Sequence, residues 1–497
     1  MNIKAEIQRL LSEIGRGKMC NSPYDAAWIA RLKEIDSEMG NSALEWICEN
    51  QLPDGSWGTL QPFYYHDRVV CTLGAMIALT YRGRRVSDKL KIQNGLQALD
   101  KITSGATRGL RADSNGATVG FELIVPTLVQ EAEKIGIIKQ QKDRLLGKLM
   151  HLRTTKLAKL TGVKISRKIT VAHSAEMAGK DRIDLLDIPN LQEINGSVGN
   201  SPSATAYYCL YVDHGNENGL SYLRALTSTR NGGAPTLDPI DIFERVWVIW
   251  NLTLAGLHQD QEVYKLIEPH IDYLESQWQT GKGLGFSKSY TPTDSDDTSV
   301  GYEILSLFGR NVDIEAILNY EEEDHFRCFH YEATPSIDVN IHVLNTLKKN
   351  GYSKNHPTIQ KIIRFITSSQ IGKSYWIDKW HVSPYYTTSH AIIACHEYAE
   401  DICNQAIEWI LKTQRANGAW GFYSFPTAEE TAYCIQALSI WNKFKQNIPK
   451  EKLVIARQWL QYNAEPPYPP LWMDKSLYGT DLLVKSAIVS ALAMLEE

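Results

Sequence analysis

The chain has 497 residues, of which 43% are hydrophobic, so at roughly 100 to 200 residues per domain we expect two or three domains with real cores. Its formal net charge of -5 gives no reason to expect a nucleic acid or an anionic membrane as a partner.

The first predicted element is a helix in the stretch MNIKAEIQRLLSEI, where Ile3, Ile7 and Leu10 fall on one face among charged residues. This pattern is neither the apolar block of a signal peptide nor a membrane span, and no later stretch is long and apolar enough to cross a bilayer. The eight cysteines show no CxxC spacing, which indicates reduced thiols packed as small hydrophobes. We therefore expect a cytoplasmic protein.

Further along, one phrase recurs: a Gln, a glycine turn and an aromatic or apolar residue. The copies are QLPDGSWG at 51–58, QEINGSVG at 192–199, QRANGAWG at 414–421 and the looser QWQTGKGLGF at 277–286. Within about twenty residues, each copy is followed by a predicted Ala- or Ser-rich helix, at Asp67, Ser201, Asp296 and Glu429. Small residues let helices pack closely around a common axis, and each half of the chain holds two copies. The repeats predict an all-α fold of two α/α barrels.

Segments with the alternating pattern of β-strands are scarce. The stretches 104–120 and 213–239 are rich in Gly and Asn and are predicted to be loops, and the second is the expected boundary between the two halves.

Three acids, Asp294, Asp296 and Asp297, precede an apolar run with helical spacing that ends near Phe308. Thr293 or Asp294 can cap this helix by accepting from its free N–H groups, which places the acids at its first turn. The repeats predict that this turn faces the mouth of the second barrel.

Such a D-x-D-D string has alternative interpretations. Acids before a helix are commonly caps and solvated surface, and calcium binding also uses carboxylates. An EF-hand counted from Asp294 would require Gly and Glu where this chain has Ser299 and Leu305. In a buried setting, like charges keep one carboxyl protonated, while a helix N-terminus stabilises the carboxylate left after proton transfer. This reading predicts a Brønsted acid strong enough to protonate an alkene.

A carbocation formed in this way would need aromatic faces around it, although each such ring is equally at home in a helical core. The candidates are Trp376, Trp380, Tyr385, Tyr386, Trp420, Phe422, Tyr423 and Trp472. Two groups of potential metal ligands, His325/Cys328/His330 and His390/His396, lack the spacing of a structural zinc site and are predicted to be core or surface residues.

Taken together, the motifs resemble those of the bacterial class II diterpene cyclases over nearly the whole chain, in particular the halimadienyl (tuberculosinyl) diphosphate synthase type, which is related to the copalyl diphosphate synthases. The matching motifs include SPYDAAWIARL at 22–32, the acid motif DSDDTS at 294–299, DKWHVSPYYTTSHA at 378–391 and LWMDKSLYG at 471–479. The resemblance implies a β barrel formed by residues 1–20 and 225–497, with a γ barrel of residues 21–224 inserted after its first helix.

The resemblance also implies that geranylgeranyl diphosphate is cyclised by protonation of its terminal alkene, with the diphosphate retained. Asp296 would donate the proton, Asp294 and Asp297 would position it, and His342 would hydrogen-bond to it. Trp380 and Tyr386 would contact the substrate.

Other expectations concern the diphosphate and the end of the reaction. Mg²⁺ would accompany the diphosphate, with Asp113 as the one acid left of the family's acidic segment, and Lys168 could reach the diphosphate. His173 matches a His that positions the terminating water in plant relatives, but the partner Asn is replaced by Thr236. This difference favours a halimadienyl or kolavenyl product, with the labdadienyl (copalyl) type as the alternative.

The class I motif DDxxD is absent from the sequence, so we expect the reaction to stop at a cyclic diphosphate that a class I synthase or phosphatase consumes. A homodimer is a further expectation. The rival readings are a squalene-hopene-like or sesquiterpene class II cyclase, a non-catalytic α-toroid and a carbohydrate-acting α/α barrel. A toroid gives no reason for the acid cluster, and a glycosidase needs two carboxylates across a sugar-sized cleft.

Overall fold

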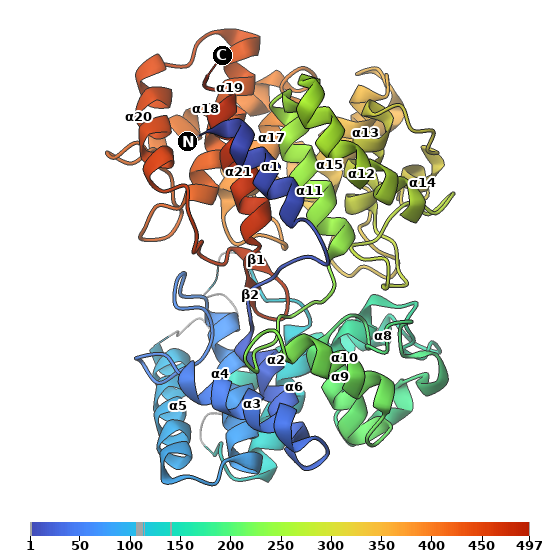
Figure 1. Ribbon diagram of the computed structural model, residues 1–497, viewed down its shortest axis with the longest axis vertical. Coiled ribbons are helices and arrows are strands. Elements are labelled where there is room, and N and C mark those ends of the chain that lie inside the picture. The colour runs from blue at the N-terminus through green and yellow to red at the C-terminus, as the bar shows by residue number, and fades with distance from the viewer. Residues whose placement is uncertain (1, 106–112, 114, 140–141, 497) are drawn as a thin grey trace.

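The computed structural model describes residues 2–105, 113, 115–139 and 142–496, and it divides them between two helical domains stacked along the long axis of the molecule (Figure 1). The N-terminal helix and residues from 240 onward share one hydrophobic core, and residues 24–234 contain the other. The second domain is therefore inserted after the first helix.

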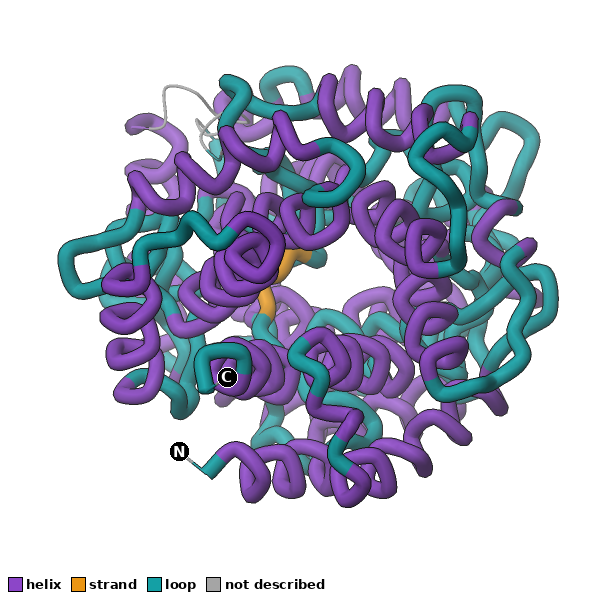
Figure 2. The backbone as a smooth tube through the Cα atoms, turned by 90° about the horizontal axis from the view of Figure 1, so that it is seen from above, coloured by secondary structure: helices purple, strands orange, loops and turns teal. Residues whose placement is uncertain are grey.

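Among the described residues, six helices close the inner ring of the first domain: α11 (Asp241–Leu254), α13 (Ser295–Leu307), α15 (Ile337–Lys349), α17 (Pro384–Cys395), α19 (Ala428–Lys445) and α21 (Asp481–Ala493). The outer helices are α1 (Ile3–Glu13), α12 (Gln261–Gln277), α14 (Glu315–Leu318), α16 (Pro357–Ser368), α18 (Glu400–Thr413) and α20 (Lys450–Tyr462). Seen from above, the helices surround a common axis (Figure 2). This α/α barrel confirms the predicted fold class, and we call it the β barrel.

The inserted domain, here called the γ domain, has an inner ring of α2 (Pro23–Ala30), α4 (Tyr65–Arg82), α6 (Phe121–Lys134), the 3₁₀ segment η3 (Thr170–Ala178) and α9 (Pro202–Tyr207). Around it lie α3 (Ser37–Glu49), α5 (Val86–Gly105), α7 (Lys142–Leu146), α8 (Leu149–Ala158) and α10 (Glu217–Thr227). The π-helical turn η6 (Tyr208–Val212) continues α9, and the short 3₁₀ turns are η1 (Arg31–Glu34), η4 (Ile183–Leu185), η5 (Ile188–Asn190) and η7 (Leu257–Gln259).

The recurring Gln–Gly phrase has the same structural role in both domains. In one copy, the Gln414 amide donates to the carbonyls of Gly418 and Lys452, which closes a turn whose Gly418 has a φ of +88°. Trp420 of the same copy donates from its indole N–H to the Ile410 carbonyl near the end of the outer helix α18. Its backbone N–H donates to the Thr431 hydroxyl on the inner helix α19. The phrase at 414–421 thus joins an outer helix to the next inner helix, and Gln51 and Trp57 make the matching hydrogen bonds in the γ domain.

The domain boundary differs from the prediction. A boundary at residue 224 or 225 cuts through α10, whose Leu226 lies in the γ core, as does the later Ala234. The β-barrel core resumes only at Ile240. The stretch 213–239 was predicted as a loop because it is rich in Gly and Asn, yet Asn216 caps α10 by accepting from the Gly219 N–H.

A short hairpin lies between the two domains. Its strands, β1 (Trp472–Met473) and β2 (Leu477–Tyr478), are the only ones in the described part of the chain, in keeping with the predicted scarcity of strands. At its turn, the Lys475 ammonium lies 2.7 Å from Glu176 Oε1 of the γ domain, and both side chains are buried. The hairpin therefore fixes the two domains to each other.

Two further expectations concern the cysteine thiols and membrane-spanning helices. All eight cysteines are free, and seven of them are buried. No helix within the described ranges has both the length and the apolar character needed to traverse a bilayer.

Candidate active site

The acid cluster sits where helix α13 begins. Asp294 is the N-cap, and its carboxylate accepts a hydrogen bond of 2.7 Å from the Asp297 N–H, which confirms one of the two predicted caps. Asp296 and Asp297 occupy the first turn of the helix. The backbone N–H groups there carry the partial positive charge of the helix end, so this turn stabilises a carboxylate.

Burial controls the protonation of this cluster. Asp294 and Asp297 are each only 3% exposed. Burial raises the pKa of Asp294, and the charge of Asp296 raises it further, against the lowering effect of the Asp297 N–H. Burial also raises the pKa of Asp297 well above its ordinary value, again with help from the two neighbouring carboxyls. The cluster therefore retains protons at neutral pH.

His342, on the neighbouring inner helix α15, holds the middle acid. Its Nδ1 lies 2.6 Å from Asp296 Oδ1, which confirms the predicted contact. Its Nε2 lies 2.8 Å from Nδ1 of His390 on α17. Three successive inner helices thus contribute one continuous chain of polar contacts from Asp296 to His390.

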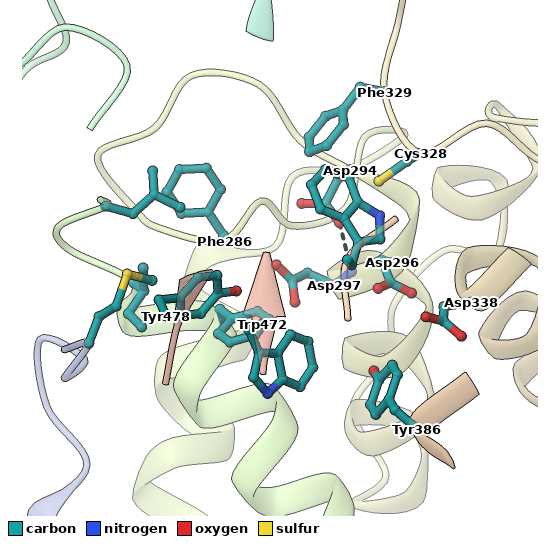
Figure 3. A pocket seen from close by; sticks show the side chains of 15 residues that line it. Phe286, Asp294, Asp296, Asp297, Cys328, Phe329, Asp338, Tyr386, Trp472 and Tyr478 are labelled. Atoms are coloured by element: carbon teal, nitrogen blue, oxygen red, sulfur yellow. Dashed lines mark hydrogen bonds between the residues drawn. The ribbon is translucent and has the colours of Figure 1, made fainter. Parts of the chain in front are cut away.

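The acids open into a cavity with an empty volume of about 670 Å³ that is partly open to solvent (Figure 3). Its apolar lining consists of Met19, Leu237, Ile240, Phe243, Phe286, Cys328, Phe329, Trp380, Tyr386, Trp472 and Tyr478. Trp380 and Tyr386, which were predicted to contact substrate, are both in this lining, and so is the candidate Trp472. An acid facing an aromatic cavity can protonate an apolar molecule and shield the resulting cation from water.

Three other aromatic candidates, Trp376, Trp420 and Tyr385, are core residues. Trp376 and Trp420 are fully buried and donate their indole N–H groups to outer-helix carbonyls. Tyr385 packs on Trp409 with ring centroids 4.7 Å apart. Neither they nor Phe422 and Tyr423 line the cavity.

The sequence reasoning missed a fourth acid, Asp338, which also lines the cavity. It is 1% exposed, its Oδ2 accepts from the Thr387 hydroxyl, and its Oδ1 has no hydrogen-bond partner among the described residues. Burial, Asp378 and Asp296 raise the pKa of Asp338 well above its ordinary value. Figure 3 shows its carboxyl turned towards Asp296. Its spacing to His342, one helical turn later, was the available signal.

Also missed were His390, assigned to core or surface, and four cavity aromatics: Phe243, Phe286, Phe329 and Tyr478. His390 stands in the apolar run SHAII of the segment whose Tyr386 was selected, and one helical turn separates the two. That spacing could have indicated a shared face.

The γ-domain residues expected at the diphosphate, the terminating water and the metal do not line this cavity; they are Lys168, His173 and Asp113. Lys168 is exposed. His173 is buried, with its Nε2 2.9 Å from Asp474 Oδ1 on the hairpin turn. The Thr236 hydroxyl donates to Met19 Sδ at 3.2 Å. His173 and Thr236 are both among the groups that lower the pKa of Asp474.

Asp113 does not fit the role of a metal ligand. Its Oδ1 accepts from the Tyr65 N–H, and its Oδ2 lies within hydrogen-bond distance of both the backbone N–H and the ring of His66. These bonds use the carboxylate to cap α4. In the described part of the chain, no group of three or more His, Cys, Asp or Glu side chains is arranged to hold a metal ion. The requirement for Mg²⁺ stays a prediction.

Comparisons with known proteins identify the family of the chain. Residues 331–437 match the squalene-hopene cyclase C-terminal domain. Over 487 residues, the chain is 46% identical to the type B diterpene cyclase of Mycobacterium tuberculosis, covering 97% of each chain. It is 29% identical to a copalyl diphosphate synthase of Salvia miltiorrhiza, of which it spans 47%.

Among solved structures, the ent-copalyl diphosphate synthase from Streptomyces platensis superposes with a TM-score of 0.79 at 26% identity, and the match covers 100% of this chain and 99% of that one. The sequence identity over almost the full length and the shared barrel pair establish the relationship. The chain belongs to the family of the type B diterpene cyclases, which are class II terpene cyclases.

Proposed function

We propose that this protein protonates the terminal alkene of geranylgeranyl diphosphate and cyclises it to a bicyclic diterpenyl diphosphate with the diphosphate retained. One observation carries the proposal: Asp296, held by His342 at a helix N-terminus, faces an aromatic cavity. The family relationship supplies the substrate class.

The reaction conserves all atoms. The O–H bond of Asp296 breaks, a C–H bond forms at the terminal alkene, and a tertiary cation results. Two further alkenes attack in turn, which forms two C–C bonds and closes both rings. Loss of one proton from the last cation gives an alkene, so the net change is an isomerisation.

The chain's own residues stabilise both charges that proton transfer creates, the carboxylate and the carbocation. The carboxylate left on Asp296 is stabilised by the helix N-terminus and by the His342 ring. The cation is flanked by rings such as Trp380, Tyr386 and Trp472, each contributing on the order of one or two kcal/mol when desolvated. The apolar lining excludes the water that would end the reaction early.

The residues matched to the plant water site favour a product in which the cation migrates before proton loss. His173 bonds to Asp474, whose pKa is lowered despite its burial, chiefly by His173. A His bound to a carboxylate is not free to position a water as in the plant relatives. We therefore favour a halimadienyl or kolavenyl product over a copalyl one.

The diphosphate is expected to be accompanied by Mg²⁺ and to lie near the γ domain, within reach of Lys168. Both statements are proposals from the family resemblance. Turnover with and without EDTA would test the metal, and since Asp113 caps α4, its replacement is expected to destabilise the γ domain whatever the metal does.

The decisive experiment is incubation of the purified protein with geranylgeranyl diphosphate and Mg²⁺, followed by phosphatase treatment and mass-spectrometric identification of the alcohol. A bicyclic alcohol that Asp296→Asn does not form supports the proposal, and its skeleton identifies the product. Recovery of only linear geranylgeraniol would overturn it. Farnesyl diphosphate and squalene, assayed in parallel, distinguish the sesquiterpene and triterpene alternatives.

A further inference from the structure

His390 is separated from Asp296 by the ring of His342. It makes no hydrogen bond to any described residue that lines the cavity. It is 2% exposed and sits on the inner helix α17. Its ring packs against aromatic neighbours, with centroids 4.2 Å from Tyr386 and 4.9 Å from Trp250. Its polar contact is the one between its Nδ1 and Nε2 of His342, at 2.8 Å.

The surroundings decide how many protons this ring carries. Burial, followed by the nearby rings of His342 and His381, lowers the pKa of His390 well below its ordinary value. The ring is therefore neutral at physiological pH and has a single N–H group.

The same surroundings decide which nitrogen carries that proton. Nε2 of His390 is buried and has no hydrogen-bond partner among the described residues. A proton there would leave a buried donor unsatisfied, which is costlier than an unsatisfied lone pair. On Nδ1, the proton is donated to Nε2 of His342. The geometry therefore favours the Nδ1–H tautomer of His390.

The tautomer of His390 determines the direction of the hydrogen bond to His342 and, through it, that of the hydrogen bond to Asp296. Because Nε2 of His342 accepts, the proton of a neutral His342 lies on its Nδ1 and is donated to Oδ1 of Asp296. An oxygen that accepts this bond does not carry the acidic proton, which is left to Oδ2. In the reverse arrangement, Asp296 would direct its proton from Oδ1 at His342, away from any molecule in the cavity.

We propose that His390 is a positioning residue that fixes the tautomer of His342 and thereby places the transferable proton on the cavity-facing oxygen of Asp296. Its consequence for catalysis rests on the function proposed above. No net proton moves through the two histidines, since each keeps one proton before and after transfer from Asp296. His390 acts only by setting the direction of the hydrogen bonds.

The first test does not depend on turnover. In protein labelled with ¹⁵N at histidine, the ring nitrogens of His342 are assigned by the loss of their signals in His342→Asn. The expected result at a pH of about 7 is a neutral ring protonated on Nδ1 and bare at Nε2. A proton on Nε2, alone or as part of an imidazolium, would overturn the proposal. Absence of cyclised product in the wild type would instead count against the proposed function.

The second test uses two variants that match in size and shape, His390→Asn and His390→Leu. Both remove the ring, but only Asn has an amide N–H that can donate to Nε2 of His342. For His390→Leu we expect kcat to fall by roughly tenfold or more with KM little changed, because positioning of a general acid is lost and the substrate contacts remain. His390→Asn should recover most of that loss.

Equal losses in the two variants, or wild-type kcat in His390→Leu, would refute the positioning role. Circular dichroism and thermal melting of both variants establish that they fold. If His390→Leu does not fold, the tautomer of His342 in the wild type decides the question.

Discussion

Lys475 provides the sharpest test of how the two domains are joined. Its side chain is fully buried, and its ammonium lies 2.7 Å from Glu176 Oε1, 2.7 Å from the Ser201 hydroxyl and 2.8 Å from the Ser203 hydroxyl. In Lys475→Met, the chain length is kept but the charge is lost, so Glu176 is left as a buried carboxylate without a cation. Breaking a buried pair in this way costs about 3 to 5 kcal/mol.

At roughly 2 to 4 °C per kcal/mol for a domain of this size, the melting transition of the γ domain should fall by about 6 to 20 °C. Differential scanning calorimetry at pH 7 measures this shift. The matched control is Lys475→Met combined with Glu176→Gln, which removes both charges and should recover much of the loss. A single variant that melts within about 2 °C of the wild type, or a double variant that melts lower than the single one, would refute the reasoning.

Three other changes test separate features of the molecule, the first of them at Asp25, which is buried on helix α2 of the γ domain. Burial is the main cause that raises the pKa of Asp25 from 3.8 to about 6, so its contribution to folding is fully present below pH 4 and is lost as the pH rises through 6. Relative to Asp25→Asn, the wild type should lose up to about 3 kcal/mol over that interval in urea titrations, and parallel stability curves would contradict this. The pKa of Asp338 is raised well above its ordinary value, so Asp338 should be protonated at pH 7. Asp338→Asn should therefore keep kcat within about threefold, and a loss beyond about 100-fold would show that the ionised form is needed. If the exposed Lys168 contacts the diphosphate, Lys168→Ala should raise KM roughly tenfold with kcat little changed, and an unchanged KM would remove it from the site.

The fold could be predicted because its signals are local. The Gln–Gly turns and the small-residue helices that follow them repeat along the sequence, and each forms its contacts between neighbouring helices of one barrel, as Gln414 and Trp420 do. The boundary between the domains was missed because α10 depends on burial of Leu226 in the γ core, which composition does not reveal.

The sequence predicted only those site residues that lie next to one another in the chain or that match a motif of the family. The acids of α13 precede one helix, and His342 came from the resemblance. Asp338 and His390 lie on α15 and α17, and only closure of the inner ring brings them beside α13. A buried polar residue in an apolar helix gives no sign in a single sequence of which partner it meets.

The composition of the cavity lining explains how a carboxylic acid can serve a cationic reaction. Among the described residues, the lining includes four carboxyl groups and no Lys or Arg. A fixed cation would strengthen the acid by stabilising its conjugate base, but it would also repel the carbocation formed a few ångströms away. The N-terminus of α13 and the ring N–H proposed on Nδ1 of His342 stabilise the carboxylate of Asp296 instead. Burial raises the pKa of Asp294, Asp297 and Asp338 and so favours their neutral forms, which makes Asp296 the carboxyl of the cluster that faces the new cation as an anion after proton transfer.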